Sequence, residues 1–225
     1  MQVRFLGHAC FELSDGDTTL LIDPFLTGNP KAATSADEVN PTTLLLTHGH
    51  QDHFGDVVDI AKRTEVPVVA ITEISDELVT EDDLEVQDIN LGGTAEFEWG
   101  SAKLVPALHT STTPRGTASA PGGLVIDFKG TVVYHLGDTA LFSDLQLVGR
   151  RRPIDLALMC IGGHYTMDRH DAVEAARLVG AQTVIPCHYN TFPPIETDAQ
   201  AFKSDVESET SSQVVVLEPG ESHSS

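Results

Sequence analysis

The sequence predicts an α/β fold in which two β-sheets pack together with helices on their outer sides, an αβ/βα sandwich. Short apolar runs separated by Gly, Pro and Asp recur along all 225 residues, a pattern typical of strands joined by turns. Helical spacing of apolar residues is rarer, and helices become frequent among the strands only in the second half. This mixture of elements favours two sheets with helices packed outside.

Each predicted strand is an apolar or alternating run bounded by turn residues. The predicted strands are residues 3–6, 10–13, 19–22, 43–46, 66–71, 96–99, 103–108, 123–127, 131–135, 156–161, 183–187 and 213–217. The predicted helices are residues 56–63, 171–179 and 198–207. In the second helix, Val173, Ala176 and Val179 share one face. No repeat or long linker divides the chain, so we expect one domain over residues 1–225, with 221–225 as a frayed Ser-rich tail.

The composition restricts the partners and the compartment. Asp and Glu total 34 against 13 Lys and Arg, for a net charge of −21, which repels nucleic acids and anionic membranes. We therefore expect a small-molecule substrate, with no nucleic-acid or membrane partner, and a homo-oligomer stays open. The acidic run at residues 81–85 is interpreted as a solvated face. The charge suggests a salt-rich habitat, a hypothesis that full stability in dilute buffer would contradict.

The termini and the cysteines predict a cytoplasmic protein. The first residues lack the apolar stretch of a signal peptide, and no apolar run is long enough to span a bilayer. Cys10, Cys160 and Cys187 are odd in number and widely spaced, without a Cys-x-x-Cys pair. They are interpreted as buried thiols in a reducing compartment.

The central feature is a cluster of histidines and an aspartate directly after the strand at residues 43–46. Since residues two apart in an extended chain point to the same side, His48 and His50 are placed to bind one ion. Asp52 and His53 then turn with the following loop and address a second ion. Imidazole and carboxylate groups suit Zn²⁺, and Mn²⁺ or Fe²⁺ accept the same donors. A polar loop with surface histidines is the alternative, which the preceding buried strand disfavours.

Three later strands each end in a further residue of metal-ligand type. His109 follows one strand, Asp138 follows another, and His188 follows a third. Open α/β folds collect their sites at the C-terminal ends of strands. Taken singly, each would more often be an ordinary residue at a strand end, but together with the first cluster they complete two coordination spheres. The predicted metal ligands are His48, His50, Asp52, His53, His109, Asp138 and His188.

The motif at residues 48–53 and the order of the later His, Asp and His resemble the metallo-β-lactamase superfamily over nearly the whole chain. More narrowly, the chain resembles a small family of metal-dependent hydrolases related to ascorbate-phosphate lactonase-like enzymes. The strings that carry this likeness are Leu6-Gly7-His8-Ala9-Cys10-Phe11, Ile22-Asp23-Pro24-Phe25, His135-Leu136-Gly137-Asp138-Thr139, Tyr165-Thr166-Met167 and Pro186-Cys187-His188-Tyr189-Asn190-Thr191.

The resemblance implies a four-layer αβ/βα sandwich of metallo-β-lactamase type that binds two divalent metal ions, with zinc expected and Mn or Fe as alternatives. It implies that His48, His50 and His109 hold the first metal. It implies that Asp52, His53 and His188 hold the second, and that Asp138 bridges the two. A water shared by the ions would lose a proton near a pH of roughly 7 and attack a small ester, lactone, thioester or phosphoester. Asp52 and Asp138 are therefore catalytic candidates as well.

Several residues outside this set are candidates for supporting roles. The context of His8 suggests a place beside the metals as a catalytic residue, with a satisfied core histidine as the alternative. Asp23 is expected to orient a ligand histidine through its second ring nitrogen, unless it only forms a turn. His164 is an extra catalytic acid or a wall of the pocket. The candidate substrate-binding residues are Arg115, Tyr165, Tyr189 and Asn190.

Rival functions share the same metals. A nuclease or phosphodiesterase of this fold is disfavoured because relatives that cut nucleic acid generally add a clamp domain or an RNA-gripping arm, for which no segment is free. Diiron oxidoreductases of the fold usually replace the second histidine of the motif with Glu, whereas this chain has His50. A metal-binding protein without turnover stays open, and turnover on a panel of esters would separate it from a hydrolase.

Overall fold

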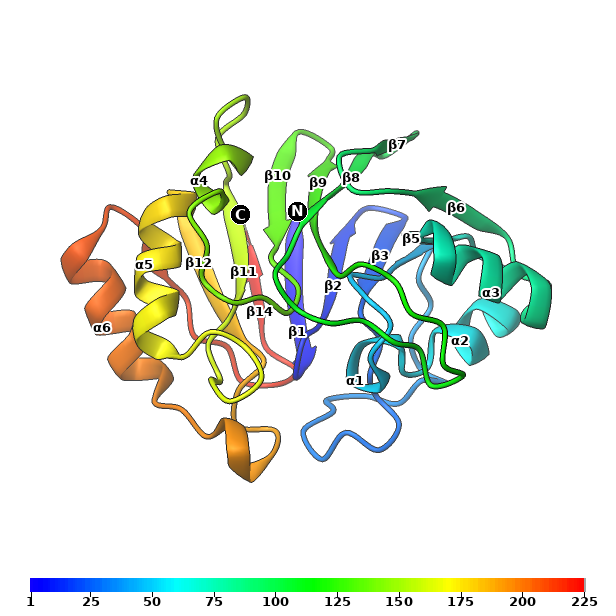
Figure 1. The fold of residues 1–225 in the computed structure, drawn as a ribbon, viewed down its shortest axis with the longest axis horizontal. Coiled ribbons are helices and arrows are strands. Elements are labelled where there is room, and N and C mark those ends of the chain that lie inside the picture. Colours follow the sequence, from blue (N-terminus) through cyan, green and yellow to red (C-terminus); the bar gives the residue numbers. More distant parts are fainter. Residues whose placement is uncertain (225) are drawn as a thin grey trace.

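The computed structural model describes residues 1–224 and arranges them as two seven-stranded mixed sheets with helices on their outer sides (Figure 1). The first sheet contains β1 (Gln2–Gly7), β2 (Cys10–Asp15), β3 (Thr18–Ile22), β4 (Thr43–Leu45), β5 (Val68–Ile71), β6 (Val86–Ile89) and β14 (Ser222–Ser224). The second contains β7 (Thr94–Phe97), β8 (Gly100–Pro106), β9 (Gly122–Phe128), β10 (Thr131–His135), β11 (Leu156–Cys160), β12 (Thr183–Cys187) and β13 (Gln213–Val214). The predicted α/β sandwich is confirmed.

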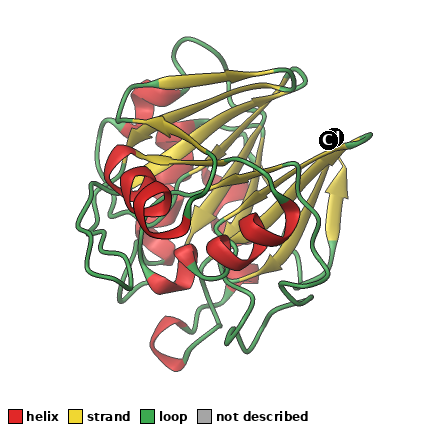
Figure 2. Cartoon of the chain, turned by 90° about the vertical axis from the view of Figure 1, so that its right-hand side faces the viewer, coloured by secondary structure: helices red, strands yellow, loops and turns green. Residues whose placement is uncertain are grey.

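The structure contains helices that mostly lie on the two outer faces of the sandwich. They are α1 (Gln51–Phe54), α2 (Val57–Thr64), α3 (Thr72–Asp82), α4 (Leu145–Val148), α5 (Arg169–Val179) and α6 (Ala199–Glu209), with a 3₁₀ turn η1 (Pro193–Ile195). Helices α2 and α3 lie beside the first sheet, in the order β14-β1-β2-β3-β4-β5-β6 (Figure 1). Helices α5 and α6 lie beside the second, in the order β13-β12-β11-β10-β9-β8-β7. Figure 2 shows the strands of both sheets from the side, with helices flanking them.

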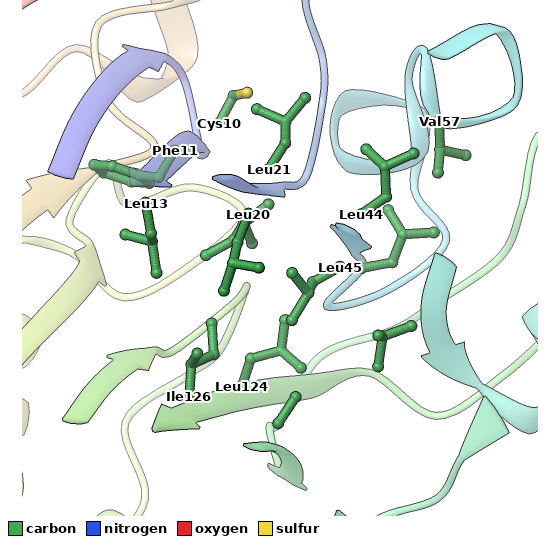
Figure 3. Packing of buried hydrophobic residues seen from close by; sticks show 14 of the residues in the cluster. Cys10, Phe11, Leu13, Leu20, Leu21, Leu44, Leu45, Val57, Leu124 and Ile126 are labelled. Atoms are coloured by element: carbon green, nitrogen blue, oxygen red, sulfur yellow. The ribbon is translucent and has the colours of Figure 1, made fainter. Parts of the chain in front are cut away.

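Alternation along the strands divides the apolar residues into two clusters. Successive residues of a strand face opposite sides, so Leu124 and Ile126 of β9 join the cluster between the sheets, whereas Val125 faces the other side. The cluster between the sheets also contains Leu20 and Leu45 of the first sheet (Figure 3). The second cluster lies between the second sheet and helices α4, α5 and α6. The three cysteines are buried and free, as predicted.

Two elements at the edge of the first sheet were not predicted. Helix α3 buries Ile74 and Leu78 among acidic residues, so its apolar periodicity is weak in the sequence. Strand β6 is short, and two of its four residues are exposed. The acidic run at residues 81–85 ends this helix, and its interpretation as a solvated face is wrong for Asp82. The side chain of Asp82 is only 4% exposed, and Lys62 and Arg115 form ion pairs with its carboxylate.

The C-terminal segment is paired rather than frayed, so that prediction is wrong for residues 221–224. Strand β14 pairs antiparallel with β1, with Gln2 opposite Ser224 and Val3 opposite His223. The amide of Phe5 donates to the carbonyl of Glu221 at 3.1 Å, which extends the pairing. Figures 1 and 2 accordingly place the two ends of the chain side by side. Ser225 lies outside the described residues. Within residues 1–224, no helix combines the length and the apolar character needed to cross a membrane.

Candidate metal centre

The seven predicted ligands gather at one edge of the sandwich, where the strands that precede them end. The histidines at 48 and 50 follow β4, and Asp52 and His53 lie on the short helix α1. His109, Asp138 and His188 follow β8, β10 and β12 of the other sheet. Both sheets therefore contribute to a single cluster, which the structure assembles from four separate parts of the chain.

Three histidines form what we call the outer group: His48, His50 and His109. One ring nitrogen from each lies within 4.8 Å of the others, and His48 Nε2 is 3.1 Å from His50 Nδ1. His48 is fully buried, whereas His50 and His109 are half-buried. The outer group is thus open toward solvent on one side.

The inner group consists of His8, Asp52, His53 and His188, whose ligand atoms also lie within 4.8 Å of one another. Asp52 Oδ2 is 3.1 Å from His8 Nε2 and 3.7 Å from His188 Nε2. All three histidines are buried, and only Asp52 is partly exposed. This group differs from the outer one in holding a carboxylate and in being shielded from water.

Asp138 lies between the two groups and is itself buried. Its Oδ1 is 3.2 Å from Nε2 of His53, and its Oδ2 is 3.1 Å from Nε2 of His188, both in the inner group. The same Oδ2 is 3.5 Å from Nε2 of His109 and 4.0 Å from Nε2 of His48, both in the outer group. One carboxylate therefore faces histidines of both groups.

The donor atoms fit a divalent cation. His53 Nε2, His188 Nε2 and Asp138 Oδ1 are buried and have no hydrogen-bond partner within residues 1–224. An unsatisfied buried polar atom costs about 1–3 kcal/mol, so three of them at one place call for a further partner. A cation among them would satisfy all three at once. Imidazole and carboxylate groups are the donors that Zn²⁺, Mn²⁺ and Fe²⁺ accept.

Asp23 supports the inner group from behind, and the hydrogen bond predicted for it is confirmed. Its carboxylate lies 2.8 Å from His53 Nδ1 and accepts hydrogen bonds from the amide and the hydroxyl of Thr47 at 2.8 and 2.6 Å. Burial raises the pKa of Asp23, but the charge of His53 and their hydrogen bond outweigh burial and lower it overall. The ionised Asp23 fixes the ring of His53 so that Nε2 points toward Asp138.

His8, a member of the inner group, is buried between Asp52 and the hydroxyl of Thr191. Its Nε2 is 3.1 Å from Asp52 Oδ2, and its Nδ1 is 2.9 Å from Thr191 Oγ1. Burial and the nearby His188 lower the pKa of His8 to about 4. The imidazole is therefore neutral at pH 7, with one ring nitrogen as donor and the other as acceptor.

Metal binding is expected to tighten as the pH rises. Burial lowers the pKa of His188, but the charge of Asp138 outweighs burial and raises it to about 9. A raised pKa stabilises the metal-free fold below the unfolded pKa of about 6.5, and this stabilisation is lost as the pH rises through the folded value. Because a metal bound among these donors would have to displace this proton, the apparent affinity for Zn²⁺ is expected to rise about tenfold or more per pH unit up to the pKa of His188.

The affinity would be measured by titrating the metal-free protein with Zn²⁺ against a competing chelator at several pH values. An apparent affinity that does not change with pH, after correction for the chelator, would contradict a protonated His188 in the metal-free protein.

Backbone strain is concentrated at the centre. His8, Asp23 and His188 have φ values of 60°, 47° and 53°, a region that residues with a Cβ rarely adopt. Such conformations cost on the order of 1–3 kcal/mol each and persist where the surroundings hold them. One such restraint is direct, since the amide of His188 donates to the carbonyl of His8 at 2.6 Å.

The Gly162→Ala substitution is expected to displace His188 and impair metal uptake. A Cβ at position 162 would lie 2.2 Å from the carbonyl oxygen of His188 and 2.9 Å from Cβ of Ile195. Because backbone atoms must shift to relieve this clash, we expect a loss of about 1–3 kcal/mol or more in the free energy of unfolding. Urea unfolding and metal content measure the two effects. The control is Gly149→Ala, where the nearest atom is 3.3 Å away, and equal losses in both variants would contradict the prediction.

Two predicted substrate-pocket residues lie on the loop after β11. Tyr165 is 57% exposed, and the exposed ring of His164 packs edge-on against it with the ring centres 4.4 Å apart. The amide of Met167 donates to the carbonyl of Thr139 at 3.0 Å, which holds this loop beside the segment that carries Asp138. The loop is thus next to the centre, and no interaction buries either ring.

Tyr189 and Asn190 follow His188 in the chain and lie near His8. Burial raises the pKa of Tyr189 to about 12, and the amide oxygen of Asn190 accepts a hydrogen bond from the amide of Thr197 at 2.7 Å. Both residues line a small cavity of about 100 Å³ that His8 and Lys31 also line. Tyr189 additionally packs against the apolar cluster of the second sheet.

Arg115, the remaining predicted substrate-binding residue, forms ion pairs with carboxylates of α3. Its guanidinium donates to the carboxylate of Asp82 at the end of α3, and it lies 3.8 Å from Glu77 of the same helix. The acidic helix therefore attracts this cation, and the ion pairs of Arg115 are with Asp82 and Glu77 of α3. Its predicted contact with substrate would require this ion pair to open.

Two supporting residues were not singled out from the sequence. Ser111 Oγ accepts a hydrogen bond from the amide of Gly49, which lies between His48 and His50, at 3.0 Å. Thr191 Oγ1 contacts His8, as described above. The only sequence signal for Ser111 is its position two residues after His109, because its partner is 62 residues away.

The fold and the cluster together define the class as the metallo-β-lactamase superfamily. A family model described as the beta-lactamase superfamily domain matches residues 2–188, which include all seven predicted ligands. The chain is 46% identical over 222 residues to a UPF0173 metal-dependent hydrolase of Thermus thermophilus, covering 98% of this chain and 97% of that protein. It is 41% identical over 222 residues to one of Natranaerobius thermophilus, covering 99% and 98%.

This chain belongs to the UPF0173 metal-dependent hydrolase family. Among solved structures it is similar to Igni18, a metallo hydrolase from the hyperthermophilic archaeon Ignicoccus hospitalis. The TM-score is 0.91 at 36% identity, covering 99% of this chain and 97% of that one. The resemblance inferred from the motifs is therefore confirmed at the level of the family.

Proposed function

We propose that the chain is a two-metal hydrolase that cleaves a small ester, lactone, thioester or phosphoester. The observation that carries the proposal is the position of Asp138, whose carboxylate faces histidines of the outer and the inner group at once. In this proposal each group holds one divalent cation, and Asp138 bridges the two. Zinc is the proposed metal because the donors are mostly imidazoles, with Mn²⁺ and Fe²⁺ as alternatives.

Cations bound there would act as Lewis acids and lower the pKa of a nearby water to about 7. Burial raises the pKa of Asp52, but the nearby imidazoles of His188 and His8 outweigh burial and lower it well below its usual range. Asp52 therefore stays ionised and available to the inner cation. His8, predicted among the catalytic residues, is proposed to position Asp52 by donating from Nε2 while Thr191 donates to Nδ1.

The substrate is proposed to approach from the open side of the outer group. Leu108 is 52% exposed beside His109, and its amide donates to the hydroxyl of Thr139 at 3.0 Å. The exposed Tyr165 belongs to the loop bonded to the same Thr139. Leu108 and Tyr165 thus give this rim exposed apolar surface, whereas two divalent cations with Asp52 and Asp138 would leave a charge of about +2 at the centre. The combination suits a small molecule with an organic group beside a carbonyl or phosphoryl oxygen.

The test is elemental analysis of the purified protein combined with a substrate panel. The panel contains nitrophenyl carboxylic esters, a lactone, a thioester and nitrophenyl phosphate mono- and diesters. We expect about two metals per chain and turnover of at least one class that a chelator removes and added metal restores. Fewer than about one metal per chain after reloading would refute the metal centre. Full metal content without turnover of any class would leave a metal-binding protein and refute the hydrolase.

A further inference from the structure

The outer face of the second sheet carries a groove that the metal centre does not use. Helices α5 and α6 lie over β11, β12 and β13, whereas within residues 1–224 neither of these two helices makes extensive contact with β8 or β9 (Figure 1). Val105, Val125 and Val132 form the apolar floor on β8, β9 and β10, and Phe142 and Leu147 form a wall at α4. The groove has a volume of about 680 Å³.

The same groove collects positive charge in a strongly acidic chain. Its lining includes four cations, Lys103, Arg150, Arg151 and Arg152, against two carboxylates. Arg152 pairs with Asp127, but Lys103, Arg150 and Arg151 form no ion pair with any carboxylate in residues 1–224. We call this site the arginine groove, defined by Val105, Val125, Val132, Phe142, Leu147, Lys103 and residues 150–152.

This distribution of cations is unusual for the molecule as a whole. Of its 13 Lys and Arg residues, seven pair with carboxylates: Lys62, Arg115, Lys129, Arg152, Arg169, Arg177 and Lys203. Although 34 acidic residues are available, the other six cations form no ion pair with a carboxylate in residues 1–224, and three of these six line this one groove. A site with unpaired cations beside an apolar floor is complementary to a ligand that has both an anionic and an apolar part.

The size and shape of the groove favour a small molecule over a protein. Small-molecule sites enclose about 300–1,000 Å³, and this volume lies within that range. A stable protein interface needs about 800 Å² on each partner and a larger, flatter surface. The alternation of β8 and β9 explains the floor, since Val105 and Val125 face outward while Leu104 and Leu124 face the other sheet.

We infer that the arginine groove binds an amphipathic organic carboxylate, with its apolar chain on the valine floor and its carboxylate at Arg150 and Arg151. Guanidinium groups bind carboxylates through paired hydrogen bonds, so Arg150 and Arg151 in the lining beside the apolar floor would set the orientation of the ligand. The valine floor removes the apolar chain of the ligand from water, and this burial favours binding. The inference does not depend on the bond that the metal centre cleaves.

The probe is decanoate, titrated calorimetrically into the metal-loaded protein below its micelle concentration. Excess acetate is present throughout, because it occupies any carboxylate site at the metal centre without an apolar contact. The groove variants are Arg150→Gln with Arg151→Gln, and separately Leu147→Gln, which alters an exposed side chain and so should fold normally. The matched control is Arg177→Gln with Lys203→Gln, an equal loss of charge on α5 and α6.

We expect one decanoate per chain, bound about tenfold more weakly by the double arginine variant and unchanged in the control. Leu147→Gln should also weaken binding, and decanol should bind less tightly than decanoate. No saturable binding, or equal affinity in the wild type and the double arginine variant, would overturn the inference. Decanol binding as tightly as decanoate would overturn its anionic part. Sedimentation of the wild type and the double arginine variant tests a second occupant of the groove. If the wild type is an oligomer, the variant is a monomer and their affinities for decanoate are equal, the groove binds a second copy of the chain and the inference is overturned.

Discussion

The Asp138→Asn substitution is expected to lower kcat/KM by about 1,000-fold or more, a loss of roughly 4 kcal/mol in transition-state stabilisation. An amide of nearly the same shape keeps the packing but loses the charge that faces histidines of both groups. Because the pKa of this carboxyl is well below its usual range, the native group is ionised at neutral pH, and the charge change is complete. Metal content should fall from about two per chain to about one or less.

The control for this variant is Asp171→Asn, which removes the same charge from the exposed first turn of α5. It should leave both the metal content and kcat/KM unchanged. If Asp138→Asn retained two metals per chain and activity within about tenfold of the wild type, the bridging position proposed for Asp138 would be wrong.

Asp23→Ala is expected to cost about 3–5 kcal/mol in the free energy of unfolding, even in the metal-free protein. The carboxylate is fully buried and bonds to His53 and to two donors of Thr47. Its removal leaves the amide of Thr47 and Nδ1 of His53 without their partner, and it removes one of the two carboxylates that face His53. Metal affinity at the inner group should fall about 10–100-fold, since a ligand histidine loses the group that orients it.

Urea unfolding of the metal-free variant separates the effect on stability from the effect on metal binding. Asp23→Asn serves as the comparison, because Asn tolerates the positive φ at this position and retains an oxygen acceptor for Thr47. The Asp23→Asn variant should lose less stability than the Asp23→Ala variant. It should nevertheless lose most of the metal affinity. Equal stability of Asp23→Ala and the wild type in the metal-free state would show that the buried network contributes little.

How far the fold was predictable depended on the strength of local patterns. Strands β10 and β12 have the predicted bounds because both are dense in β-branched and apolar residues between clear turns. Helix α3 was missed because only Ile74 and Leu78 mark its buried face, and its polar residues resemble a solvated loop. Strand β14 was missed because its pairing with β1 joins residues more than 200 positions apart, which no local pattern records.

The candidate site was predictable to a similar degree. All seven predicted ligands lie in the cluster, because each follows a strand whose end falls at the same edge. Their binding of metal remains a proposal. The partners of Ser111, Thr191 and Arg115 were not predictable, since each contact depends on loop positions set by the whole fold. Local spacing therefore identified the donor atoms but not the hydrogen bonds that hold them.

The origin of the cluster in both sheets has a mechanical consequence. The outer and inner groups each combine side chains that follow β4 with side chains that follow β8 or β12. An ion held by either group would therefore act as a cross-link between the two halves of the sandwich. A free metal concentration of 100 times the dissociation constant adds about 2.7 kcal/mol per site to the free energy of unfolding. Removing the metal with a chelator should therefore lower the melting temperature and weaken the packing between the two sheets. Thermal stability and catalysis would then both depend on the bound ions, which would hold the two sheets together as well as take part in the reaction.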